Sequence, residues 1–291
     1  QLQIFESVAQ HLSYTRAAEV LYLTQPAVSM QIKQLESVVG IPLFERMGKS
    51  LFLTEAGDEL LVYARNISQQ LIEVSDVFDE LRGSKKGRLN IAVATTASSF
   101  SLKLLGEFYK RFPGANITFD VTNRASLLNH LEKNTTDMVI MGQPPEGLDV
   151  EAESFMDNPL VVVAPIGHEL VGKKNIPLKV LQQETFIMRE HGSGTRIAME
   201  RFFEESGYSI SSVMEISSNE AINEAVVAGL GLGIVSKDTL ELKLKMGQLK
   251  ILDVESFPIM RHWYLVHRKG KRFTALMTAF KNLVQQESKE I

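Results

Sequence analysis

The chain has 291 residues, of which 44% are hydrophobic and 8% aromatic, and its formal net charge is −4 at pH 7. This composition is typical of a globular protein with about two or three domains, and it excludes disordered and fibrous chains. The absence of cysteine excludes disulfides, thiolate metal sites and cysteine nucleophiles. Because the sequence has neither a signal-peptide core nor a long apolar run, we expect a cytoplasmic protein without a membrane partner.

The N-terminal segment predicts two helices joined by a tight turn. Thr24 is a good N-cap and Pro26 falls in the first turn, so the second helix begins near Thr24. Its apolar positions recur every three or four residues and predict a buried stripe of Val28, Ile32, Leu35 and Val39. Its outward face carries Gln25, Ser29, Met30 and Lys33. Small alanines before the turn favour a helix-turn-helix that reads DNA, but the spacing alone also fits an ordinary helical hairpin.

A short hairpin follows this helix. Two apolar segments, 43–46 and 50–53, flank Met47-Gly48-Lys49 and predict a β-hairpin. Such a hairpin beside a helix-turn-helix is called a wing, and its basic residues are placed to contact DNA phosphates. We therefore predict an all-α winged helix-turn-helix domain over residues 1–53. Its expected DNA contacts are Arg16, Thr24, Gln25, Pro26, Ser29, Gln31, Lys33, Arg46 and Lys49. This domain has as many acidic as basic side chains, so a monomer should bind DNA weakly and a dimer is expected.

The next segment, 54–87, predicts a long linker helix and a hinge. Thr54 is suited to cap the helix, which would run to about Arg82 and be roughly 43 Å long at about 1.5 Å per residue. Its apolar positions follow a heptad pattern that favours pairing with a second copy, through Leu60, Ala64, Ile67, Leu71, Val74, Phe78 and Leu81. The alternative is a surface helix packed on its own domain. Gly83 to Gly87 predicts the hinge.

From Arg88 onward, strands and helices alternate, which predicts an α/β effector region with largely parallel sheets. We divide this region into lobe I (88–161 and 268–291) and lobe II (162–267), with a cleft between them. The last strand, His262 to His267, and the helix after it are able to return to the first lobe. Periplasmic solute receptors share this two-lobed architecture, but the helix-turn-helix, the heptad helix and the lack of an export signal argue against that class.

The sequence offers no catalytic or metal site. Its six histidines lack metal-ligand spacing, and no acid–base or nucleophile pair can be assembled, so we expect neither an enzyme nor a bound cofactor. Gly229-Leu230-Gly231-Leu232-Gly233 precedes a strand instead of following one, which indicates close backbone packing and not a dinucleotide loop. Gly192 to Arg196 lacks the first glycine of a nucleophile elbow.

Gly192 to Thr195 instead predicts an anion site, because it precedes a helix whose free N–H groups would point into the cleft beside Arg196. Two further hydroxyl-rich turns, 95–98 and 217–220, stand at similar helix starts. The expected effector-binding residues are Thr95, Thr96, Ala97, Ser98, Gln143, Ser193, Gly194, Thr195, Arg196, Asn219 and Glu220. Simple helix capping explains each turn as well, and the alternative for Arg196 is an intramolecular salt bridge beside a cleft that binds no effector.

Several motifs in the first 57 residues resemble the LysR-type transcriptional regulators. They are Ser13-Tyr14-Thr15-Arg16-Ala17-Ala18, Thr24-Gln25-Pro26-Ala27-Val28-Ser29, Leu35-Glu36, Pro42-Leu43-Phe44-Glu45-Arg46 and Leu53-Thr54-Glu55-Ala56-Gly57. Met30 and Lys49 depart from the commonest pattern on the DNA face.

The C-terminal motifs resemble the LysR-type regulators of carbon fixation, which control Calvin-cycle and RuBisCO operons. These motifs are Val93 to Ala97, Met141 to Val150, Arg189 to Arg196, Ser218 to Ile222, Ala228 to Gly231 and Phe257 to Tyr264. The resemblance implies a dimer or dimer of dimers that binds promoter DNA, works with RNA polymerase and responds to a phosphorylated or nucleotide metabolite. Regulators of other pathways share these features and sense other small acids.

Overall fold

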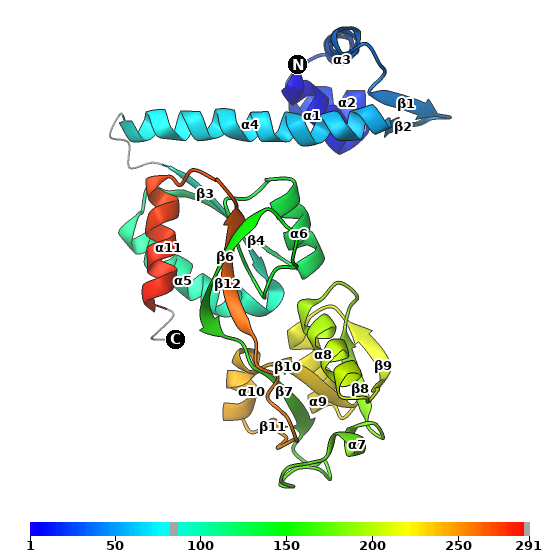
Figure 1. Cartoon of the computed structure of the whole chain (residues 1–291), viewed down its shortest axis with the longest axis vertical. Helices are drawn as coiled ribbons and strands as arrows, with labels where there is room; N and C mark the ends of the chain where they lie inside the picture. Colours follow the sequence, from blue (N-terminus) through cyan, green and yellow to red (C-terminus); the bar gives the residue numbers. More distant parts are fainter. Residues whose placement is uncertain (82–86, 288–291) are drawn as a thin grey trace. The chain divides into compact units, whose positions relative to one another are not determined.

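The computed structural model describes residues 1–81 and 87–287, without the side chains of residues 76, 77 and 79–81. The chain forms two compact units, one in its N-terminal segment and one in the remainder. The first unit (Figure 1) consists of α1 (Leu2–His11), α2 (Tyr14–Val20), α3 (Gln25–Val39), the hairpin β1 (Phe44–Met47) and β2 (Ser50–Leu53), and α4 (Glu55–Leu81). The predicted winged helix-turn-helix and linker helix are therefore confirmed.

The core of the first unit is built by the helical stripes that the sequence predicted. Val28, Ile32 and Leu35 of α3 are buried against Phe5 of α1 and the paired alanines of α2. Val39 was expected in the same stripe but is 41% exposed, because Gly40 adopts φ +83° and ends the helix there.

Gly57 explains the close approach between α4 and the wing. A Cβ atom at this position would lie 2.1 Å from the carbonyl oxygen of Leu43, and that oxygen also accepts a hydrogen bond from the Thr54 N–H. We expect Gly57→Ala to lower the free energy of unfolding of this unit by about 1 to 3 kcal/mol, because the backbone would have to move. Urea unfolding measures this effect, and Gly106→Ala, where a Cβ would meet open space, is the matched control.

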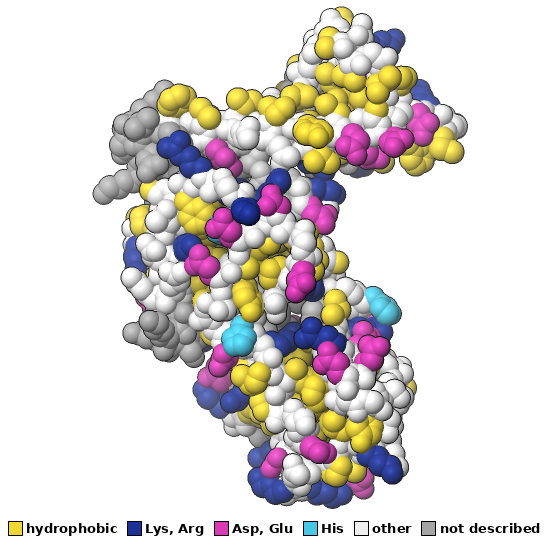
Figure 2. All heavy atoms as spheres, viewed as in Figure 1, with side chains coloured by type: hydrophobic (Ala, Val, Ile, Leu, Met, Phe, Trp, Pro, Cys, Tyr) yellow, Lys and Arg dark blue, Asp and Glu magenta, His cyan; other side chains and the backbone are white. Residues whose placement is uncertain are grey.

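The linker helix α4 is 27 residues long, and it begins where Thr54 Oγ1 accepts a hydrogen bond from the Gly57 N–H at 3.1 Å. Its heptad seam has two parts. Ala64 is buried and Leu60 half-buried in the core of the first unit. The next four seam positions are between 44% and 60% exposed, and they are Ile67, Leu71, Val74 and Phe78. Hydrophobic side chains follow α4 in Figure 2. The Leu81 side chain and hinge residues 83–86 lie outside the described residues.

The second unit contains two five-stranded sheets, one in each lobe. In lobe I the strand order is β4-β3-β5-β12-β6, formed by β3 (Arg88–Ala94), β4 (Asn116–Thr122), β5 (Met138–Met141), β6 (Val150–Asp157) and β12 (His262–Arg268). Its helices are α5 (Ser98–Arg111), which follows the short turn η1 (Thr95–Ala97), α6 (Arg124–Glu132) and α11 (Ala275–Glu287). Helices α5 and α11 pack on one face of this sheet and α6 on the other.

In lobe II the strand order is β11-β7-β10-β8-β9, formed by β7 (Leu160–Pro165), β8 (Thr185–Arg189), β9 (Ser211–Ile216), β10 (Leu232–Ser236) and β11 (Leu249–Ile251). Its helices are α7 (Leu178–Leu181), α8 (Gly194–Glu205), α9 (Asn219–Val227), α10 (Glu241–Lys245) and the turn η2 (Lys237–Leu240). Helix α8 packs on one face of the sheet and α9 on the other. Gly231 approaches the Thr185 carbonyl so closely that a Cβ would lie 2.7 Å from its oxygen, which confirms the packing role of this glycine.

Three details of the predicted organisation are wrong. Strand β12 pairs with β5 and β6, so it belongs to lobe I and the predicted boundary at residue 267 moves to the segment before His262. Strand β7 starts at Leu160, so lobe II begins slightly before the predicted residue 162. The sheets are mixed and not largely parallel, because the chain crosses between the lobes twice and the crossing strands pair in antiparallel fashion.

Candidate functional site

The outward face of α3 forms a shallow, mostly polar groove. The helix begins at Thr24, whose Oγ1 accepts a hydrogen bond from the Ala27 N–H at 3.4 Å. The groove is lined by Gln25, Pro26, Ser29, Met30, Lys33, Gln34 and Ser37. Gln31 is half-buried and does not line this groove, and the Thr24 hydroxyl is already engaged as a cap. Of the predicted DNA contacts on α3, the side chains left free to meet base edges are therefore Gln25, Ser29 and Lys33.

The wing presents basic side chains at a fixed position beside α3. Arg46 and Lys49 are exposed on the hairpin, and Arg16 is exposed on α2. A carboxylate oxygen of Glu36, near the end of α3, accepts hydrogen bonds from the Leu43 N–H at 2.9 Å and the Phe44 N–H at 3.4 Å. This contact joins the end of α3 to the start of the wing.

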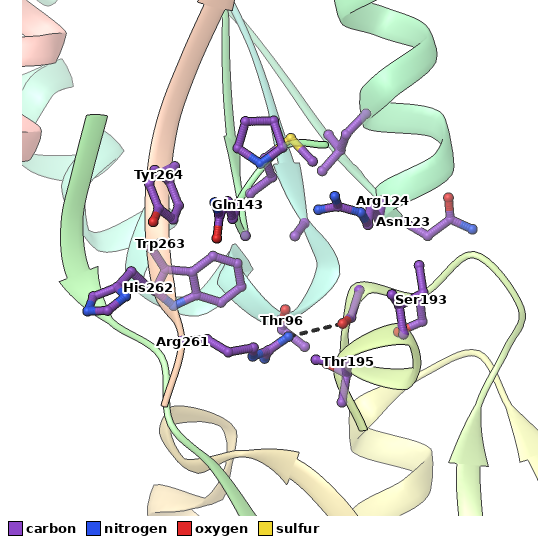
Figure 3. A pocket seen from close by; sticks show the side chains of 18 of the residues that line it. Thr96, Asn123, Arg124, Gln143, Ser193, Thr195, Arg261, His262, Trp263 and Tyr264 are labelled. Carbon is purple, nitrogen blue, oxygen red and sulfur yellow. Dashed lines mark hydrogen bonds between the residues drawn. The ribbon is translucent and has the colours of Figure 1, made fainter. Parts of the chain in front are cut away.

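A cavity of about 490 Å³ lies in the second unit, with walls from both lobes (Figure 3). Figure 2 shows Lys and Arg side chains gathered where the lobes meet. Of the predicted effector residues, the structure brings six to this cavity: Thr95, Thr96, Gln143, Ser193, Gly194 and Thr195. Sequence reasoning missed several other polar lining residues, among them Asn123, Arg124, Arg189, Arg261 and His262.

Four of the predicted residues do not line the cavity. Ala97 is fully buried in the core of lobe I. The Ser98 hydroxyl donates a hydrogen bond to the Thr95 carbonyl at 2.8 Å. Asn219 Oδ1 accepts a hydrogen bond from Arg189 at 2.8 Å, and a Glu220 carboxylate oxygen accepts one from the Ser218 hydroxyl at 2.8 Å. Among these side chains, Ser98 and Asn219 bond to residues that line the cavity, whereas Ala97 belongs to the core and Glu220 is exposed.

Arg196 also lies outside the cavity lining, contrary to the prediction. Its guanidinium pairs with Glu200 at 2.7 Å and Glu215 at 2.5 Å, and it donates a hydrogen bond to the Arg189 carbonyl at 3.0 Å. Hydrogen bonding to Glu200, followed by that to Glu215, raises the pKa of Arg196. The intramolecular salt bridge is thus the correct interpretation of this residue.

Two other arginines supply the positive charge of the cavity. Arg261 precedes β12 and is half-buried, and its Nη1 donates a hydrogen bond to the Gly194 carbonyl at 3.1 Å. Its Nε and Nη2 are buried without a hydrogen-bond partner among the described residues. Burial, and then the nearby charge of Arg124, lower the pKa of Arg261 to about 10. Burial also lowers the pKa of Arg124, the first residue of α6.

No carboxylate in the described part of the chain forms an ion pair with either Arg124 or Arg261. The other cavity arginines differ in this respect, since Arg189 pairs with Glu190 and Arg201 with Glu205. Both Arg124 and Arg261 reach into the cavity in Figure 3. Burying an unpaired positive charge is costly, so the pair is suited to a negatively charged ligand.

The start of α8 adds hydrogen-bond donors to this charge. Ser193 is the N-cap residue, but its side chain makes no capping bond, and both Ser193 and Thr195 are almost completely buried. The N–H groups of the first helical turn and the positive end of the helix dipole favour an anion. Guanidinium groups, hydroxyls and a helix start together suit a phosphate or carboxylate.

Neither a metal site nor a membrane span is found in the described ranges. No group of three or more His, Asp or Glu side chains there could hold a metal ion. No helix among the same residues is both long and apolar enough to cross a bilayer.

Two relatives match almost the whole chain. A RuBisCO operon transcriptional regulator of Allochromatium vinosum is 52% identical over 288 residues, which cover 99% of this chain and 95% of that protein. The HTH-type transcriptional activator CmpR of Synechocystis is 44% identical over 280 residues, covering 96% and 92%. The solved regulatory domain of Synechocystis CcmR in complex with 2-PG is 39% identical, with a TM-score of 0.68, and covers 70% of this chain and 98% of that domain.

Two family models account for both units. Residues 1–58 match the bacterial regulatory helix-turn-helix protein, lysR family, and residues 82–289 match the LysR substrate binding domain. These matches agree with the DNA-reading helix and the two-lobed cavity domain. The chain therefore belongs to the LysR family of bacterial transcriptional regulators, which are DNA-binding proteins and not enzymes.

Proposed function

We propose that this chain regulates carbon-fixation genes and that its cavity binds a small phosphorylated acid as the effector. The observation that carries the effector proposal is the pair of half-buried arginines that line the cavity, Arg124 and Arg261, which lack a carboxylate partner among the described residues. The target genes are supported by relatives named as RuBisCO operon regulators. The ligand class is supported by the CcmR regulatory domain, whose structure contains 2-PG.

The dimensions and chemistry of the cavity fit such a ligand. A volume of about 490 Å³ lies within the range of small-molecule sites, about 300 to 1,000 Å³. The phosphoryl group would accept hydrogen bonds from the two guanidiniums and from the start of α8, while Gln143 and Tyr264 line another part of the wall. A nucleotide also fits the volume, so ligands must be compared by their charge and size.

Calorimetry on the full chain tests the effector proposal. We expect 2-phosphoglycolate to bind, and glycolate, which lacks the phosphoryl group, to bind at least about tenfold more weakly because charge-assisted hydrogen bonds are lost. Adenosine nucleotides and inorganic phosphate complete the comparison. Equal affinity for glycolate and 2-phosphoglycolate would contradict a phosphoryl-binding cavity.

We further propose that a dimer, or a dimer of dimers, binds promoter DNA and contacts RNA polymerase. The four exposed apolar positions on the second half of α4 support pairing with another copy of the helix. Pairing would also bring two recognition helices to one operator, which compensates for the balanced charge of each winged domain. The name of the CmpR relative, a transcriptional activator, supports a role in activation.

Gln25 and Lys49 are expected to serve different parts of DNA recognition. Gln25→Ala should reduce the preference for operator over random DNA by about 1 to 3 kcal/mol, because a base-edge contact is lost. Lys49→Ala should weaken binding to both DNAs alike and reduce the salt dependence, because a phosphate contact is lost. Fluorescence anisotropy at several salt concentrations measures both effects. An unchanged operator preference in Gln25→Ala would show that Gln25 does not read bases.

A further inference from the structure

Arg189, at the end of β8, makes hydrogen bonds in two directions from a buried position. Within lobe II, its Nε and Nη2 donate to the Glu190 carboxylate at 2.8 and 3.0 Å, and its Nη1 donates to Asn219 Oδ1 at 2.8 Å. Its Nη2 also reaches lobe I, where Thr95 Oγ1 accepts at 3.1 Å. The charge of Arg189 is thus neutralised inside lobe II, and its remaining bond joins the two lobes.

The lobe I end of this bond belongs to the cavity wall. Thr95 begins the short turn η1 directly after β3, and Thr95 and Thr96 both line the cavity. A displacement of Thr95 would therefore move Thr96. The turn is held inside lobe I by a second bond, from the Ser98 hydroxyl to the Thr95 carbonyl at 2.8 Å. One turn thus carries both a lobe-to-lobe bond and part of the ligand site.

The lobes also approach closely beside this bond. A Cβ atom on Gly192 would lie 3.3 Å from the Ala125 Cβ, and one on Gly194 would lie 3.5 Å from the Arg124 Cδ. Gly192 and Gly194 belong to the lobe II loop that leads into α8, whereas Ala125 and Arg124 start α6 of lobe I. Loop 192–194 can pack against α6 at this distance only while the lobes are closed here.

We propose that Arg189 is an interlobe latch, a positioning residue that holds the effector domain closed before the effector binds. Its charge is balanced by Glu190, whereas Arg124 and Arg261 have no carboxylate partner among the described residues and so remain available to an anion. Arg261 also joins the lobes through its bond to the Gly194 carbonyl, and the Arg189 latch adds to that contact. If the lobes are already closed, they rearrange little when the effector binds. Less of the binding free energy is then spent on fixing the lobes relative to each other than in an open domain. The expected change in effector affinity rests on the proposed function, whereas the bond between the lobes does not.

Hydrogen exchange of the ligand-free full chain tests the latch. Thr95→Val keeps the side-chain shape but removes the acceptor of the interlobe bond, and we expect exchange in segments 91–98 and 187–194 to become several-fold faster. Ser98→Ala is the matched control, because it removes a hydroxyl from the same turn whose bond stays inside lobe I. Equal exchange in the two variants would overturn the latch, whatever the effector does.

A double-mutant cycle shows whether the effect passes through Arg189. Arg189→Lys keeps the positive charge next to Glu190 but lacks the forked guanidinium that reaches Thr95. Thr95→Val should lower effector affinity about tenfold in the wild-type background and should have no further effect in Arg189→Lys. An undiminished effect in the second background would contradict the latch. If the wild type binds no phosphorylated acid, the proposed function fails while the exchange result still decides the latch.

Discussion

Arg124→Gln is expected to lower the affinity for the phosphorylated effector by about 10- to 100-fold without destabilising the unliganded chain. The loss of affinity follows from losing charge-assisted hydrogen bonds worth about 1.5 to 3 kcal/mol. The stability is expected to stay constant or rise, because Arg124 forms no ion pair in the described part of the chain and its charge opposes that of Arg261. Calorimetry and thermal unfolding without ligand measure the two effects separately.

Arg196→Gln is the matched control for this experiment. It removes the same charge from the neighbourhood of α8, but it breaks the ion pairs with Glu200 and Glu215 outside the cavity. We expect lower thermal stability of the unliganded chain and unchanged effector affinity. The opposite pattern, with affinity lost in Arg196→Gln and kept in Arg124→Gln, would restore the sequence-based assignment of Arg196 and contradict the site proposed from the structure.

Leu71→Glu is expected to separate the proposed dimer and weaken operator protection. Leu71 is 60% exposed in the middle of the four apolar positions on α4, so pairing of this helix would bury two leucines that the substitution turns into two facing charges. Analytical ultracentrifugation should show a smaller species, and footprinting should show weaker protection because two recognition helices no longer bind together.

Gln70→Glu adds the same charge one residue away on α4, at an exposed position outside the seam. We expect this control to keep both the oligomeric state and the footprint. A Leu71→Glu chain that sediments as the wild type and binds its operator normally would exclude the seam as the dimer contact. Loss of both properties in the two variants alike would instead indicate a general effect of charge on α4.

The N-terminal unit could be predicted from sequence because its signals are local. Thr24 as a cap and the periodic apolar stripe each act within a few residues. The sequence allowed β12 to return to lobe I but did not establish its place in the sheet. That place depends on pairing with β5 and β6, which are distant in the chain. Strand β6 was missed because its exposed, acidic sequence lacks the apolar alternation of a typical strand.

The candidate cavity shows the same division between local and distant signals. Ser193 and Thr195 were found because a helix start is visible in the sequence. Arg124 and Arg261 were missed because their burial and lack of partners depend on the packing of separate segments. Arg196 was chosen for its place beside the loop, although the spacing of four residues to Glu200 already favoured a helical ion pair.

Thr54 belongs to the wing and to the linker helix at once. Its hydroxyl donates a hydrogen bond to the Pro42 carbonyl at 2.8 Å, its N–H donates to the Leu43 carbonyl at 3.0 Å, and its Oγ1 caps α4. Because Thr54 bonds to both elements, we expect the β1–β2 hairpin and α4 to move together. If two chains pair along α4 as proposed, a small change in the helix crossing angle would tilt both wings together.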